Sequence, residues 1–113
     1  MFQTISMSQL EVFLEQGKPV TLLDVRTEEE FLQGHLDGAV NIPLEELEGR
    51  GSDLPGERTI VVYCAHGGRS MMAARWLERN GFSVINTAGG LAAYRGKHMV
   101  FLEKAFDRER QNY

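Results

Sequence analysis

The chain has 113 residues, of which 42% are hydrophobic, and this suits one domain, residues 1–113, with a single core. A net charge of −4 and a pI of about 5.3 exclude a general affinity for nucleic acids and anionic membranes. The single cysteine excludes an internal disulfide, and no Cys/His cluster has the spacing of a zinc site. The sequence shows neither a signal peptide nor a membrane-spanning run, so we expect a cytoplasmic protein.

The first elements are a short strand and a capped helix. Residues 2–5 form a candidate strand, and Ser6 with Gln9 forms a capping box for a helix over residues 7–16. Gly17 ends that helix, because glycine readily adopts the left-handed backbone of a helix C-terminus.

A near-continuous apolar run over residues 20–25 then predicts a strand of the kind buried in parallel sheets. Thr27 and Glu30 form a second capping box, for a short helix that extends to about residue 33. Residues 34–38 are predicted to be a loop, because two glycines bound them.

Residues 39–42 form a short predicted strand that Pro43 stops, and residues 44–48 form a brief acidic helix. Gly, Pro, Ser and Asp are frequent over residues 49–58, which indicates a surface connection. Residues 59–63 then give the next buried strand.

The last part of the chain contains a predicted helix over residues 70–80, ended by Gly81, and a fifth strand over residues 82–86. Residues 88–90 open a final helical region. In the tail, residues 97–113, the side chains of Met99, Leu102 and Phe106 share one helical face. We expect a helix that closes the sheet, with dimer formation or partner docking as the alternative.

Cys64 stands where the fourth predicted strand ends and a short loop leads into a helix. Gly67 and Gly68 allow this loop to curl with its N–H groups inward, and Arg69 adds a full positive charge. Such a ring favours the thiolate of Cys64 over the thiol, and it would also hold an anion carried on the sulfur.

The alternation of strands with short helices predicts a three-layer α/β fold, with about five parallel strands and helices on both faces. Ligand sites in such sheets lie at the carboxyl ends of the strands, and Cys64 is placed at that edge.

Several separated motifs together resemble the rhodanese-like sulfurtransferase domain. They occur in the family's order: Leu23-Asp24-Val25-Arg26, Glu30-Phe31, Gly34-His35-Leu36, Gly38-Ala39, Asn41-Ile42-Pro43, Tyr63-Cys64 through Gly68-Arg69-Ser70, Ala73-Ala74, Leu77, Gly81-Phe82 and Gly89-Gly90. The resemblance covers residues 4 to about 96. The chain has Tyr94 where most members carry Trp, and many members lack the tail from Lys97 onward.

The resemblance implies a thiosulfate sulfurtransferase (rhodanese) type of activity through a Cys64 persulfide, without cofactor or metal. The donor would be a small anion such as thiosulfate, and the acceptor cyanide or a low-molecular-weight or protein thiol. Persulfide binding would fall to the residues that follow the cysteine, namely Ala65, His66, Gly67, Gly68, Arg69 and Ser70.

Three of these residues have individual expectations. Arg69 would attract the donor and favour the thiolate; pairing with a surface carboxylate is the alternative. His66 either orients the donor or faces solvent. Ser70 is expected to be the helix N-cap, with a hydroxyl that could reach the sulfur.

Four residues are expected to support the site. Asp24, Arg26 and Glu30 are expected to pair and so fix the loops that flank Cys64, with a place for Arg26 near the pocket as the alternative. His35 is expected to fasten its own loop by a hydrogen bond rather than to act in catalysis. The run of acidic residues at 28–30 also suits a helix N-terminus.

Other functions compete with small-molecule sulfur transfer. A cysteine phosphatase or arsenate reductase also has a Cys-to-Arg loop, but four residues separate Cys64 from Arg69, whereas the related phosphatases have five. Protein-to-protein sulfur carriage stays open, and so does a regulatory module, although a degenerate module would be expected to lose its cysteine. We expect a monomer or a weak dimer.

Overall fold

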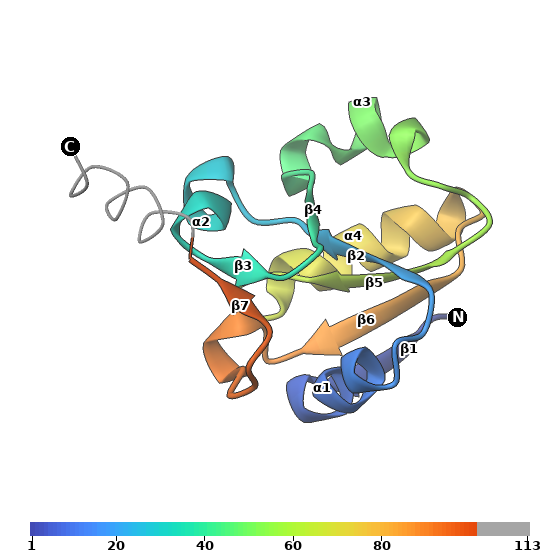
Figure 1. Cartoon of the computed structure of the whole chain (residues 1–113). Coiled ribbons are helices and arrows are strands. Elements are labelled where there is room, and N and C mark those ends of the chain that lie inside the picture. The colour runs from blue at the N-terminus through green and yellow to red at the C-terminus, as the bar shows by residue number, and fades with distance from the viewer. Residues whose placement is uncertain (102–113) are drawn as a thin grey trace.

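The computed structural model describes residues 1–101, and five parallel strands form its central sheet. The strands lie in the order β1 (Gln3–Ser6), β6 (Val84–Ala88), β5 (Thr59–Tyr63), β2 (Val20–Asp24) and β4 (Val40–Asn41). Every neighbouring pair is parallel, with Leu23 beside Val62 and Val62 beside Asn86 at the centre. The predicted five-stranded parallel sheet is therefore confirmed (Figure 1).

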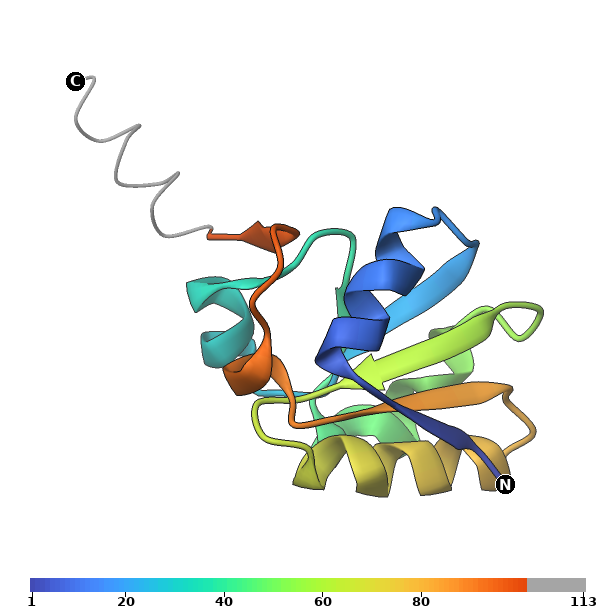
Figure 2. The same cartoon turned by 90° about the horizontal axis from the view of Figure 1, so that it is seen from below.

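Helices cover both faces of the sheet, as predicted. Helix α1 (Met7–Glu15) lies on one face, and α4 (Gly68–Arg79) with α3 (Leu47–Arg50) lies on the other (Figures 1 and 2). Side chains alternate along each strand, so Leu22 faces the α1 layer and Leu23 faces the α4 layer. Both strand faces are thus apolar, which is the reason for the unbroken hydrophobic runs in the sequence.

Both predicted capping boxes are present. The Ser6 side chain accepts from the Gln9 N–H and the Gln9 side chain accepts from the Ser6 N–H, which starts α1. Thr27 and Glu30 do the same for α2 (Glu28–Gln33). Each box satisfies N–H groups that have no partner within the first helical turn.

Helix α4 begins at Gly68, two residues before the predicted start. Gly67 precedes it with φ of 109°, a left-handed conformation that suits glycine, and this bend lets the helix start directly after the loop. At the other end Gly81 has φ of 88° and Phe82 donates its N–H to the Leu77 carbonyl. Residues 81–82 thus finish the helix, so β6 begins at Val84 rather than at residue 82.

The connection between β4 and β5 contains more helical structure than predicted. A 3₁₀ turn, η1 (Leu44–Glu46), leads into α3, and a second turn, η2 (Gly51–Asp53), follows directly. Gly51 is buried because the Trp76 ring lies against it, leaving no room for a Cβ. Most of residues 49–58 are exposed, as predicted for a surface connection, but the helical turns in its first half and the burial of Gly51 were not predicted.

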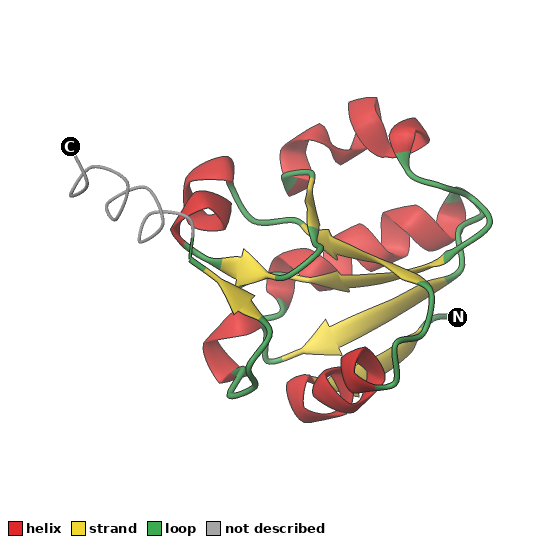
Figure 3. Ribbon diagram, viewed as in Figure 1, coloured by secondary structure: helices red, strands yellow, loops and turns green. Residues whose placement is uncertain are grey.

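A second, two-stranded sheet lies beyond the carboxyl edge of the first (Figure 3). Strand β3 (His35–Leu36) pairs antiparallel with β7 (Met99–Val100), His35 opposite Val100 and Leu36 opposite Met99. The predicted loop over residues 34–38 thus contains a strand, and the tail is extended rather than helical at Met99. The other two residues of the expected helical face, Leu102 and Phe106, lie outside the described residues.

Candidate active site

Cys64 follows directly on β5 and is 1% exposed. Its Sγ accepts a hydrogen bond from the Gly67 N–H at 3.0 Å and one from the Ser70 N–H at 3.3 Å. These amides belong to the loop and to the first turn of α4, whose N-terminal N–H groups carry partial positive charge. The sulfur therefore lies where backbone dipoles converge on a single atom.

The loop favours the charged form of the sulfur. Burial alone would raise the pKa of the Cys64 thiol, but hydrogen bonds from Ser70, Gly67 and His66 outweigh it and lower the pKa below its ordinary value. The Ser70 contribution comes from both its hydroxyl and its N–H. A thiolate is the nucleophilic form of cysteine, so these contacts prepare Cys64 for attack on an electrophile.

The segment after β6 holds the loop from outside. Leu91 donates its N–H to the Cys64 carbonyl at 2.8 Å, and Ala92 donates to the Ala65 carbonyl at 2.9 Å. Both carbonyls are thereby held by hydrogen bonds from outside the loop, which fixes the peptide planes at its start.

Gly90 is required for this close approach. Its φ of 59° with ψ of −170° is a backbone conformation that is essentially restricted to glycine, and a Cβ there would overlap the backbone of Cys64 and Ala65. The sequence pointed to Gly89-Gly90 only as a family motif. Their supporting role depends on the proximity of residues 64–65 and 90, which no local pattern shows.

Ser70 is not the N-cap of α4, contrary to expectation, because the helix starts earlier and Gly67 takes that position. Ser70 is fully buried in the first turn instead. Its hydroxyl donates to the Gly67 carbonyl oxygen at 3.1 Å and so ties the helix start to the loop, and it also lies 3.4 Å from the Thr87 carbonyl oxygen in β6.

Arg69 is paired with a carboxylate, the alternative that the sequence disfavoured. It donates to the two oxygens of Glu30 at 2.7 and 3.0 Å, and this pair lowers the pKa of Glu30 to about 2. Glu30 also belongs to the capping box of α2, so one carboxylate links the starts of two helices. The hydrogen bonds to Glu30 chiefly raise the pKa of Arg69, and the charge of Cys64 adds to the effect.

Asp24 and Arg26 form a buried ion pair at the end of β2. Arg26 donates to both carboxylate oxygens of Asp24, the shortest contact being 2.7 Å, and also to the Gly34 carbonyl at 2.6 Å. Two main-chain segments are thereby fastened together at the carboxyl edge of the sheet. This is the loop-fixing arrangement that the sequence suggested for these residues.

His35 is held by its own loop, as expected. Its Nδ1 lies 2.9 Å from the Phe31 carbonyl oxygen, and its ring stacks on the Phe31 ring with centroids 3.7 Å apart. The next residue, Leu36, donates its N–H to the Tyr63 hydroxyl.

An open pocket of about 390 Å³ lies beside the cysteine loop. Ala65 and the exposed His66 form its edge on the loop side, so His66 faces both solvent and the pocket. The remaining described lining comes from α2 and the residues on either side of it, from the residues after β6 and from the β7 region: Arg26, Glu30, Gln33, Gly34, Leu91, Ala92, Met99 and Phe101. Gly68, also exposed, has no atom within 4 Å of an added Cβ.

Comparison with known proteins settles the family. The model of the rhodanese-like domain matches residues 6–97. The chain belongs to the rhodanese-like domain family. The structure superposes on that of a rhodanese-like domain protein from Staphylococcus aureus with a TM-score of 0.81. The two sequences are 29% identical, and the match covers 88% of this chain and 98% of the other.

Curated relatives of this rhodanese-like domain include sulfurtransferases. A sulfurtransferase of Allochromatium vinosum is 34% identical over 83% of this chain and 89% of its own length. The thiosulfate sulfurtransferase GlpE of Shewanella oneidensis is 36% identical over 82% and 92%. Another relative, Bacillus subtilis YrkF, whose name describes a candidate sulfur carrier, is 37% identical, and the chain spans about half of its length. Within residues 1–101, every helix is too short or too polar to cross a lipid bilayer.

Proposed function

We propose that this rhodanese-like domain is a sulfurtransferase that moves a sulfane sulfur from a donor such as thiosulfate to cyanide or a thiol through a persulfide on Cys64. The observation that carries the proposal is the pair of N–H groups, from Gly67 and Ser70, directed at Sγ. The sulfurtransferases among its relatives support sulfur transfer as the reaction class.

In the first half-reaction the Cys64 thiolate attacks the outer sulfur of thiosulfate. An Sγ–S bond forms, the S–S bond of thiosulfate breaks, and its electron pair leaves with sulfite. In the second half-reaction cyanide or a thiolate attacks the terminal sulfur of the persulfide. The Sγ–S bond then breaks and its electron pair returns to Cys64, so the enzyme is regenerated without a redox cofactor.

The amides of the loop stabilise negative charge at each stage. The thiolate, the leaving thiolate of the second step and the terminal sulfur of the persulfide are all anionic, and the N–H groups of residues 65–70 provide positive dipoles without a proton to lose. Because Cys64 is 1% exposed, a donor has to present a projecting sulfur atom to reach Sγ.

Phosphate chemistry is a weaker proposal. Glu30 is a carboxylate beside the loop, and the Arg69 pairing lowers its pKa to about 2, so it is ionised near neutral pH and does not donate a proton to a leaving group. Protein-to-protein sulfur carriage is the stronger second candidate, favoured by the likeness to YrkF, because it uses the same persulfide and differs in its partner.

Mass spectrometry of the intact protein after incubation with thiosulfate tests the proposal. We expect the mass of one added sulfur atom, its absence in Cys64→Ser, and its loss with thiocyanate formation when cyanide is added. If neither thiosulfate nor an organic persulfide adds sulfur to the chain, the proposal is wrong. Hydrolysis of an aryl phosphate that depends on Cys64 would support the phosphatase instead.

A further inference from the structure

The segment after residue 97, where the family match ends, forms one wall of the pocket beside Cys64. β7 pairs with β3, and Asp37 donates its N–H to the His98 carbonyl at 2.7 Å. This pairing places Met99 and Phe101 on the pocket lining, across from Ala65 and His66 of the loop. The wall therefore follows the residues that the family model matches.

Gly34 allows the wall to stand this close. A Cβ on Gly34 would lie 3.1 Å from the Phe101 ring and 3.3 Å from the Met99 methyl carbon, so both side chains lie directly over it. The φ of Gly34 is 164°, an extended backbone that any residue adopts, so contact rather than conformation favours glycine here.

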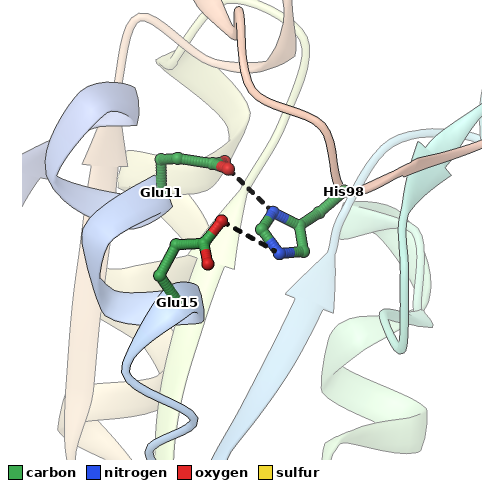
Figure 4. A group of neighbouring side chains, drawn as sticks. All are labelled: Glu11, Glu15 and His98. Atoms are coloured by element: carbon green, nitrogen blue, oxygen red, sulfur yellow. Dashed lines mark ion pairs between the residues drawn. The ribbon is translucent and has the colours of Figure 1, made fainter.

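A cluster of polar side chains holds the start of β7 against α1 (Figure 4). His98 Nδ1 lies 2.8 Å from Glu11, and His98 Nε2 lies 3.7 Å from Glu15. The Tyr94 hydroxyl also donates to Glu11 and accepts the N–H of His98. We name Glu11, Glu15, Tyr94 and His98 the clasp.

The clasp works as a hydrogen-bonded anchor. Burial tends to raise the pKa of Glu11, but the hydrogen bonds from Tyr94, Lys97 and His98 outweigh it, so the carboxylate is ionised and can only accept. His98 Nδ1 therefore carries the proton of their short contact. Both ring nitrogens of His98 face carboxylates, which fixes the residue directly before Met99.

The polar side of the pocket offers little free positive charge. Arg26 is the arginine among the described lining residues, and its guanidinium donates hydrogen bonds to Asp24 and to the Gly34 carbonyl. Arg69, which lies nearby, is bound by Glu30. The lining also includes the apolar side chains of Leu91, Met99 and Phe101. Such a surface stabilises a carbon skeleton better than a bare inorganic anion.

We propose that Met99 and Phe101 are specificity-determining residues that select an acceptor thiol carried on an apolar carbon chain, and that the clasp positions them. The inference rests on the proposed sulfur transfer and concerns its second half-reaction. The acceptor thiolate attacks the terminal sulfur of the Cys64 persulfide, the Sγ–S bond breaks, and the new organic persulfide leaves while its carbon chain lies along β7.

Steady-state transfer from thiosulfate to three acceptors tests this: cyanide, 2-mercaptoethanol and 6-mercaptohexanol. Each methylene that the wall covers contributes roughly fourfold. 6-Mercaptohexanol has four more methylenes than 2-mercaptoethanol, so with two of these covered we expect its kcat/KM to be higher by roughly 16-fold. In Met99→Ala and Phe101→Ala this ratio falls to about two or below, while kcat/KM for cyanide changes less than twofold. Met72→Ala removes the same side chain from an exposed site on α4 and keeps the wild-type ratio.

The clasp has its own readout. In His98→Ala we expect the KM for 6-mercaptohexanol to rise several-fold with kcat little changed. His98→Gln keeps a hydrogen-bond donor for Glu11, so its KM should lie between those of the wild type and His98→Ala. Circular dichroism shows whether each variant is folded.

Two failures are distinguishable. If the wild-type protein forms no persulfide by mass spectrometry, the proposed function fails and the inference with it. If the persulfide forms but the wild type shows no preference for the longer thiol, or the wall variants lower all three acceptors equally, the inference alone is wrong.

Discussion

Arg69 donates two hydrogen bonds to the carboxylate of Glu30, across the gap between the starts of α4 and α2. Arg69 thereby connects the first turns of two helices, and its charge also interacts with that of Cys64. The bidentate geometry suits a guanidinium and would not be reproduced by lysine.

This pair should make stability depend on pH in the acidic range. The pKa of Glu30 is lowered to about 2 in the folded chain, against about 4.3 in an unfolded one, so its stabilisation is complete above about pH 4.3 and is lost as the pH falls toward 2. Glu30→Gln keeps the capping box but not the charge, and we expect its free energy of unfolding to be lower by about 1 kcal/mol at pH 7, because both partners are partly exposed.

Urea denaturation between pH 2 and pH 7 measures the effect. The difference between wild type and Glu30→Gln should shrink as the pH approaches 2. Glu29→Gln makes the same charge change on the exposed face of α2 and should remain close to wild type throughout. A constant difference at every pH would contradict the assignment.

The thiol of Cys64 should titrate below the ordinary value of about 8.5. The rate of alkylation by iodoacetamide as a function of pH gives the midpoint, and denatured protein supplies the reference. Ser70→Ala removes one of the contacts that lower this pKa, so its midpoint should shift upward, whereas Ser8→Ala, on the exposed part of α1, should not. A midpoint in the folded protein at or above the denatured value would refute the role of the loop amides.

Replacement of Gly90 should disrupt the site by displacing the backbone of Cys64 and Ala65. Gly90→Ala puts a side chain into a backbone conformation reserved for glycine and into the backbone of residues 64–65. We expect a loss of about 3 kcal/mol in the free energy of unfolding, with a raised Cys64 pKa where the variant folds. Gly56→Ala, at an exposed position with no atom within 4 Å of the new Cβ, is the matched control, and equal stabilities of the two variants would exclude the proposed contact.

The buried pair of Asp24 and Arg26 should be costly to break and cheaper to remove as a whole. Asp24→Asn leaves the Arg26 charge without its partner, and we expect it to lower the free energy of unfolding by about 3–5 kcal/mol. The double variant Asp24→Leu/Arg26→Met removes both charges and should regain a large part of that loss. Thermal and urea unfolding check both values, and a double variant less stable than Asp24→Asn would be the contrary result.

Local signals in the sequence were sufficient for much of the fold. Capping boxes at Ser6 and Thr27 and the two-sided apolar strands act within a few residues, so α1, α2, β2 and β5 follow from the pattern. The pairing of β3 with β7 did not follow, because two-residue strands have no visible periodicity and their partners lie far apart in the chain. Its discovery requires the tertiary fold.

The site divides in the same way. Cys64 and the inward amides were predictable, because a strand, two glycines and a helix start follow one another directly. The engagement of Arg69 by Glu30 was not, since Glu30 stands in a run of three acidic residues typical of a solvated surface. Only the parallel sheet brings the starts of α2 and α4 to one edge.

The two hydrogen bonds from Leu91 and Ala92 to the carbonyls of Cys64 and Ala65 also bear on protein engineering. A designer who grafts residues 64–70 onto another strand-to-helix junction would copy the amides that donate to the sulfur and still omit the contacts that orient them. The transplanted loop could turn its carbonyls inward, and the thiol would then behave as an ordinary cysteine. The smallest transferable unit is therefore two segments, residues 63–70 together with residues 88–92.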